Sequence, residues 1–166
     1  VIIFTLFGYS NGTPRDPLTV GNLPALPTEF QELQEGDLII SINGILLPKI
    51  GNTFDDNFIN KLPKKPVLDY TVNRNGTEVI ARGPYLRPAL IGAVSPKSAA
   101  LAAGLLPGDV VVAVNDESVF SFTQLVSAVE GSDGRSLDLL VWRDGLLTEK
   151  TLTPRKVDEP QSEGGF

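Results

Sequence analysis

The chain has 166 residues, which is enough for one large domain or for two small ones of about 80 residues each. Hydrophobic residues make up 42% and charged residues 20%, a globular composition that argues against disorder, and the net charge of −6 argues against a nucleic-acid partner. Cys and His are both absent, which excludes disulfides, a Ser-His-Asp triad, a Cys-His pair and His-based zinc sites within these residues. The first expectation is therefore a binding or regulatory module.

The N-terminal stretch, residues 1–20, is expected to precede the first folded unit. Residues 1–7 are apolar but too few to cross a bilayer, which needs about 20 residues. They fit either a strand that pairs with the rest of the chain or the last turns of a transmembrane helix cut by the start of the sequence. Residues 8–17 are rich in Gly, Asn, Ser, Thr and Pro, which indicates an exposed linker.

An internal repeat is the most informative feature of the chain. Residues 36–43, Gly-Asp-Leu-Ile-Ile-Ser-Ile-Asn, match residues 108–115, Gly-Asp-Val-Val-Val-Ala-Val-Asn, at an offset of 72 residues. Residues 68–76 match residues 137–145 at an offset of 69 residues, in the same order along the chain. We therefore predict two copies of one module of about 70 residues, joined near residues 83–87, where prolines punctuate the sequence.

The first copy is assigned to residues 21–84. Its Gly-Asp turn is followed by a short β-branched strand that ends in a turn at Asn43-Gly44. Two further strands are expected on either side of a tight turn at Asn75-Gly76, because Asn and Gly tolerate a positive φ. A short helix ending before Pro63 is predicted between the two strand regions by the spacing of Phe54, Phe58, Ile59 and Leu62.

The second copy is assigned to residues 85–156 and shows the same order of elements. A small helix is predicted over residues 98–103, ended by Gly104, and turns are predicted at Asn115-Asp116 and Asp144-Gly145. Ser121 and Gln124 have the spacing of a capping box at the start of a longer helix, and Gly131 is the expected stop. Residues 157–166 are polar and acidic and are expected to form a linker.

This order of elements resembles a bacterial PDZ domain. The residues that carry the resemblance are 95–115, which contain a Pro, a Ser-Ala pair, Ala-Gly-Leu, Gly-Asp and a strand ending at Asn115. The first copy keeps Gly36-Asp37 and Asn43-Gly44, but residues 23–27 replace the Ala-Gly-Leu helix, so it resembles a divergent PDZ module. The resemblance implies a mainly β fold with short helices (α+β), in the form of two PDZ-like, partly open β-barrels in tandem.

Two such modules after an apolar segment resemble the periplasmic region of a site-2-type intramembrane zinc metalloprotease, of the regulator of sigma-E protease family of Gram-negative bacteria. That family implies a parent enzyme in the inner membrane, with residues 1–7 as a helix end and a membrane-tethered protein as substrate, such as an anti-sigma factor. Zinc in the parent is held by a His-Glu-x-x-His helix and a later Asp. Those motif positions do not occur in this sequence, so no catalytic or metal residue is carried over, and Asp37 and Asp109 are assigned to structural turns.

PDZ domains bind an extended peptide along a sheet edge beside their long helix, and backbone amides at the end of the groove capture a C-terminal carboxylate. In the second copy, the resemblance places the groove between a strand near residues 86–91 and the helix over residues 121–130. Residues 83–86 would form or flank the carboxylate loop, and Leu90 and some side chains of the helix would line the pocket. The same apolar side chains on a helix with a single apolar stripe also fit a core role. The candidate peptide-binding residues are Gly83, Tyr85, Leu86, Leu90, Phe122, Leu125, Val126 and Val129.

The resemblance also implies a second role, in which the pair lies over a membrane active site and excludes substrates with bulky periplasmic domains. Three alternatives stay open from the sequence. The pair could belong to an HtrA-like serine protease, to a carboxy-terminal processing protease, or to a secretion scaffold without enzymatic activity. The residues that flank this segment would distinguish them, because each class places different motifs there.

Overall fold

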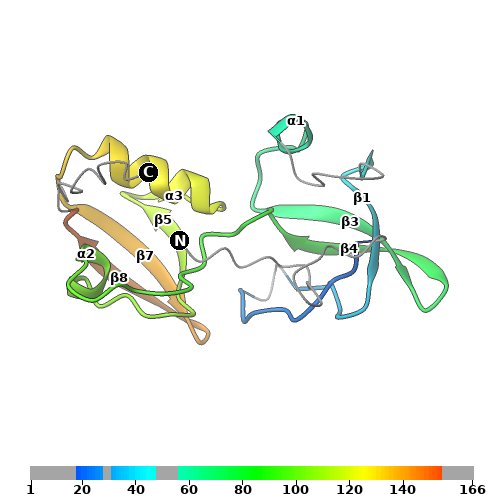
Figure 1. The fold of residues 1–166 in the computed structure, drawn as a ribbon, viewed down its shortest axis with the longest axis horizontal. Coiled ribbons are helices and arrows are strands. Elements are labelled where there is room, and N and C mark those ends of the chain that lie inside the picture. The colour runs from blue at the N-terminus through cyan, green and yellow to red at the C-terminus, as the bar shows by residue number, and fades with distance from the viewer. Residues whose placement is uncertain (1–17, 28–30, 48–55, 155–166) are drawn as a thin grey trace, which may run out of the picture.

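The computed structural model describes residues 18–27, 31–47 and 56–154. Within these residues it contains two four-stranded antiparallel sheets, with the strand orders β2-β1-β3-β4 and β6-β5-β7-β8. Figure 1 shows one sheet in each half of the molecule. The fold is mainly β with short helices, as predicted, and neither sheet closes into a barrel among the described strands.

The first module forms its sheet from a short hairpin and a long one. The short strands pair Ser41 with Leu46, and a β-bulge between Ile39 and Ser41 shifts the register against β3. The long hairpin pairs every residue from Val67 with Pro84 to Arg74 with Thr77. The elements of this module are β1 (Leu38–Ile42), β2 (Ile45–Leu46), α1 (Asp56–Ile59), β3 (Val67–Arg74) and β4 (Thr77–Pro84).

The second module repeats this arrangement and adds two helices that are well defined by their caps. Its β-bulge lies between Val111 and Ala113, at the position equivalent to the bulge in β1. The helix α2 begins after Ser98, whose side chain accepts from Leu101 N, and Gly104 follows it with a φ of 74°. The elements are α2 (Ala99–Ala102), β5 (Val110–Val114), β6 (Glu117–Ser118), α3 (Phe122–Gly131), β7 (Leu137–Arg143) and β8 (Leu146–Leu152).

The four predicted hairpin turns all form, and both residues of each have a positive φ. This is the backbone geometry of the tight turns whose twist matches that of the flanking strands. Even Asp116 adopts it, with a φ of 64°. The turns are Asn43-Gly44, Asn75-Gly76, Asn115-Asp116 and Asp144-Gly145.

The first module begins earlier than the predicted boundary at residue 21. Val20 is 1% exposed, its amide donates to Asp37 O at 2.8 Å, and Thr19 pairs with Leu38. An apolar side chain at residue 20 is therefore part of the core rather than of a linker. The expected helix end and linker at residues 1–17, the linker at residues 157–166 and Phe54 lie outside the described residues. No helix in the described ranges is both long and apolar enough to span a bilayer.

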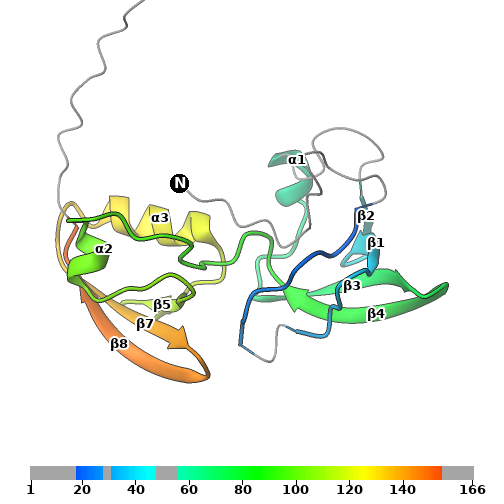
Figure 2. The same cartoon turned by 60° about the horizontal axis from the view of Figure 1, so that its bottom comes forward.

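The junction between the modules is packed on both sides. Tyr85 is buried, and its amide donates to Pro66 O at 3.1 Å. Its ring forms a T-shaped pair with Phe120 at a centroid distance of 5.1 Å. On the other side of the junction, Phe122 N donates to Arg87 O at 2.8 Å. Figure 2 shows the connection that leaves β4 and enters the second module. The modules are thus joined by buried side chains and hydrogen bonds.

The strand β5 contributes to two hydrophobic clusters with its two faces. Val111 and Val114 belong to the core of the second module, whereas Val110 belongs to the cluster that contains Tyr70, Ile42 and the rest of the first core. Trp142 and Phe120 also pack against this first cluster. Alternate residues of a strand point to opposite faces, so one short strand connects both cores.

Candidate functional site

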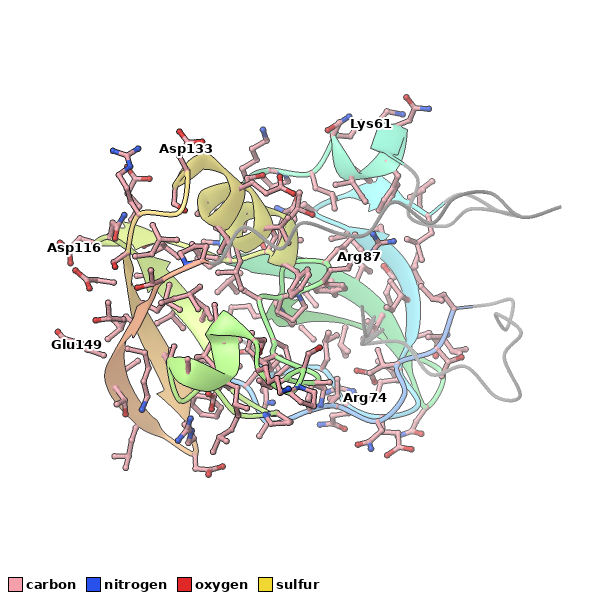
Figure 3. The ribbon with its side chains drawn as sticks, turned by 60° about the vertical axis from the view of Figure 1, so that its left-hand side comes forward. Lys61, Arg74, Arg87, Asp116, Asp133 and Glu149 are labelled. Carbon is pink, nitrogen blue, oxygen red and sulfur yellow. The ribbon has the colours of Figure 1, made fainter. Side chains whose placement is uncertain are left out.

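The helix α3 is fixed at its start by the predicted capping box. The Ser121 hydroxyl accepts from Gln124 N at 3.2 Å, and Gln124 Oε1 accepts from the amides of Phe120 at 2.8 Å and Ser121 at 3.1 Å. The expected stop at Gly131 is wrong: Gly131 is the last helical residue, and Ser132 continues the right-handed backbone as its hydroxyl donates to Val129 O. The positive φ comes at Asp133, which lies just beyond the helix (Figure 3).

A groove of about 550 Å³ runs between α3 and the segment of residues 91–95. Its floor is apolar, since Leu105, Leu125 and Leu139 are each buried. Phe122 and Val126 form its rim and are 37% exposed, so apolar surface on the helix is open to solvent. The residues that line the groove are Ile91, Gly92, Ala93, Ser95, Lys97, Ser98, Ala99, Ala100, Leu105, Phe122, Leu125, Val126, Val129, Glu130, Leu139, Leu152 and Pro154.

The segment beside the groove has one edge paired with β5. Ile91 N donates to Asp109 O at 2.7 Å, Gly108 N donates to Ile91 O at 2.7 Å, and Val111 N donates to Ala89 O at 2.9 Å. Backbone groups of successive residues in an extended chain point to alternate edges. Gly92 therefore presents its N–H and C=O groups away from β5, on the side of the groove that it lines. An extended edge of this kind can accept another strand.

Comparison with known proteins supports this description of the second module. Residues 90–143 match the family model of the PDZ domain. Most of the second module is therefore similar to a PDZ domain. The match spans the groove-lining segment, α2, β5 and α3, and it ends with β7.

The chain is also similar to zinc metalloproteases. It is 37% identical over 65 residues to the zinc metalloprotease RasP of Geobacillus kaustophilus, covering 39% of this chain and 15% of that protein. It is 38% identical over 73 residues to the regulator of sigma-E protease RseP of Escherichia coli K12, covering 44% and 16%. It is 31% identical over 70 residues to the regulator of sigma-W protease RasP of Bacillus subtilis, covering 42% and 17%. The aligned part is less than a fifth of each relative, and the similarity is consistent with a PDZ region of such a protease.

The structure brings together four of the eight candidate peptide-binding residues. Phe122, Leu125, Val126 and Val129 line the groove beside α3. The other four lie outside the groove lining: Gly83 belongs to β4 of the first module, and Tyr85, Leu86 and Leu90 are buried in the first hydrophobic cluster. Peptide binding itself stays a prediction.

Most of the groove wall opposite α3 lies beyond the predicted strand near residues 86–91. Residues 91–95 and Lys97 follow directly after Leu90 in the chain, so the segment was predicted at nearly the right place but a few residues too early. The signal that marks it is Gly92, a glycine within an apolar extended run, which allows close approach of another backbone.

The Gly-Asp turns hold equivalent ion pairs in both modules, at some distance in sequence from α3. Arg143 Nε donates to Asp109 Oδ1 at 2.6 Å and Arg143 Nη2 to Asp109 Oδ2 at 2.8 Å, while Asp109 Oδ2 also accepts from Leu106 N. Arg74 binds Asp37 in the same way in the first module. Both carboxylates are 1% exposed, so their role is structural, as predicted for these turns.

Zinc does not fit the residues of this chain. The sequence has no His and no Cys, which are the usual zinc ligands. The part of the chain that the structure describes also contains no group of three acidic residues placed to hold a metal ion.

Proposed function

We propose that this chain is the tandem PDZ region of a membrane zinc metalloprotease that cleaves membrane-spanning substrates, and that its second module binds an extended peptide. Catalysis and zinc binding belong to other parts of the parent protein. The observation that supports the proposal is the apolar groove between α3 and residues 91–95 in a domain that matches the PDZ family. The names of the relatives favour a metalloprotease over the serine protease and scaffold alternatives.

The groove combines the two features that strand addition requires. The outward edge at Gly92 offers backbone hydrogen bonds, which contribute affinity without regard to sequence. The apolar wall of α3 offers a pocket for alternate side chains of the added strand, which contributes selectivity. Burying a leucine-sized side chain contributes about 1.5–3 kcal/mol, so two such side chains supply about 3–6 kcal/mol of the roughly 8 kcal/mol that corresponds to micromolar affinity, and the backbone hydrogen bonds contribute to the remainder.

A pair of matched variants tests peptide binding. Val126→Glu places a charge on the exposed rim of the groove, and Leu147→Glu places the same charge on β8, where Leu147 is 61% exposed and not part of the groove. We expect Val126→Glu to weaken binding of an apolar peptide at least about tenfold, and Leu147→Glu to leave it within about twofold. Fluorescence anisotropy measures both. Equal affinities in the two variants would contradict the proposal.

The packed junction supports a second function for the pair, that of a steric filter. On this proposal the segment lies on the periplasmic side of the inner membrane, over the active site of the parent protease. A filter needs only bulk and a fixed position, and the buried contacts of Tyr85 and Phe120 hold the modules together. The substrate, a membrane-tethered protein such as an anti-sigma factor, would reach the active site only after its bulky domain is removed.

Deletion of residues 21–155 from the full-length parent enzyme tests the filter. We expect the deletion to permit cleavage of untrimmed substrates, and the intact enzyme to cleave only trimmed ones. Cleavage is followed by electrophoresis of a tagged substrate, with a trimmed substrate as the control for retained activity. If the deleted enzyme still cleaves the trimmed substrate but leaves the untrimmed one intact, the filter is excluded.

A further inference from the structure

We infer that the groove beside α3 takes an internal stretch of a polypeptide chain, extended and with apolar side chains at alternate positions, rather than a free C-terminus. The inference rests on the proposed peptide binding and concerns which kind of peptide binds. Capture of a chain end requires backbone amides or a cation placed to bind its carboxylate. A groove that captures chain ends should therefore have free backbone amides or an unpaired cation at one of its two ends.

At the end where α3 begins, four backbone donors are already used within the protein. Gln124 Oε1 accepts from Phe120 N and Ser121 N, and Ser121 Oγ accepts from Gln124 N. Phe122 N donates to Arg87 O at 2.8 Å. A helix N-terminus attracts an anion through its free N–H groups, and here these four donors would have to leave protein partners first.

In the connection that enters the groove segment, the amides of Leu90 and Ile91 are also used within the protein. Pro88 has no N–H group, Leu90 N donates to Pro88 O at 2.7 Å, and Ile91 N donates to Asp109 O. The residues predicted to form the carboxylate loop are used elsewhere, since Tyr85 N donates to Pro66 O and Gly83 pairs with Leu68 in the first sheet. Arg87 is an exposed cation at the end of α3 opposite Asp133, and its guanidinium is the candidate partner for a carboxylate at this end of the groove (Figure 3).

The far end of the groove is open and carries no net charge. Lys97, next to the start of α2, and Glu130, in the last turn of α3, line it together, and both are exposed. A carboxylate attracted by Lys97 would also meet Glu130, whereas a neutral chain can continue past both residues into solvent. Between the two ends, the floor of Leu105, Leu125 and Leu139 accepts apolar side chains, which point to one face at every second residue of a strand.

Two peptides of one sequence test the inference. The probe is a fluorescent peptide of about ten residues in which Val, Phe and Leu alternate with Ser and Thr, made once with a free C-terminal carboxylate and once with both ends capped. We expect the whole chain to bind the two within about twofold of each other. We also expect Arg87→Gln to change neither affinity by more than about twofold.

Three other results would contradict the inference. If the free carboxylate improves affinity by about tenfold or more, and Arg87→Gln removes that gain, the groove captures chain ends and the inference is wrong while the proposed peptide binding stands. If neither peptide binds, the proposed function fails and the inference fails with it. If the chain instead forms a dimer that Val126→Glu dissolves in light-scattering measurements, a second copy occupies the groove and the inference is overturned.

Discussion

The equivalent aspartates of the two Gly-Asp turns show how single residues stabilise each module. Asp37 and Asp109 are buried, and each accepts two hydrogen bonds from an arginine at the end of a long hairpin strand and one from a backbone amide. The arginines also donate to backbone carbonyls, Arg74 to Glu32 O and Arg143 to Gly104 O. Each pair thus ties the turn before the first strand to the far end of the sheet.

Asp109→Asn leaves the Arg143 guanidinium without its charged partner and keeps the shape of the side chain. We expect the free energy of unfolding to fall by about 2–4 kcal/mol, because one member of a buried, hydrogen-bonded ion pair is lost. Urea titration measures the change. The control is Lys65→Met at the exposed pair with Asp69, 3.9 Å apart, where the loss should stay below about 1 kcal/mol. Similar losses in both variants would show that burial of the pair contributes nothing.

The same carboxylates predict a loss of stability in acid. Hydrogen bonds from Arg74 hold the pKa of Asp37 below its usual value. Burial alone would raise the pKa of Asp109, but hydrogen bonds from Arg143 and the Leu106 amide outweigh it and lower that pKa too. A carboxyl group with a lowered pKa in the folded state stabilises the fold above its usual pKa, and this stability is lost as the pH falls through the folded value.

We therefore expect the free energy of unfolding to decline as the pH drops below about 4, and to decline less steeply in the Asp37→Asn, Asp109→Asn double variant. Urea unfolding measured from pH 7 downwards gives both curves. Parallel curves for the double variant and the original protein would assign the acid sensitivity to other groups.

At the scale of elements, local sequence determined most of what was predicted correctly. The hairpin turns and the start of α3 depend on residues within three or four positions of one another, such as Asn75-Gly76 or Ser121 with Gln124. The end of α3 was misplaced because Ser132 can still adopt the helical backbone, which no spacing rule at Gly131 reveals. Gly83 and Tyr85, the expected carboxylate-loop residues, lie outside the groove lining because their partners are in the first module, distant in sequence.

Gly83→Ala tests the role that the structure gives to this residue within β4. A methyl group at residue 83 would lie 2.6 Å from Leu33 Cδ1 and 2.7 Å from Tyr70 Cε2, inside the first core. We expect a loss of about 1–3 kcal/mol in the free energy of unfolding from overpacking, and no change in peptide affinity. Gly131→Ala, at a position with no atom within 4 Å of the added carbon, is the stability control. If the Gly83→Ala variant is folded but binds peptide more weakly, Gly83 takes part in peptide binding, contrary to this expectation.

At the scale of the whole molecule, contacts at the junction restrict the orientation of one module relative to the other. Tyr85, Leu86 and Val110 share one hydrophobic cluster, so the first core extends into the second module. The repeat in the sequence predicted two modules but gave no sign of this contact, because Tyr85 and Phe120 are 35 positions apart and neither belongs to a repeated motif. The relative rigidity of the pair depends on such contacts and not on the linker composition alone.

Phe120→Ala removes the ring that meets Tyr85 and should let the modules reorient independently. The pair itself contributes about 0.5–1.5 kcal/mol, so each module should stay folded. NMR relaxation should give one correlation time for both modules in the original protein and two shorter ones in the variant. Leu101→Ala, at an exposed position on α2, is the control that should keep the common value. A common correlation time in Phe120→Ala would show that other contacts fix the junction.

Amide chemical shifts during peptide titration give the most direct test of the central claim that the second module binds an extended chain beside α3. The largest chemical-shift changes are expected on residues 91–95 and on α3 from Phe122 to Val129, with small changes throughout the first module. Changes centred on Tyr85 and Leu86, or spread evenly over both modules, would contradict it.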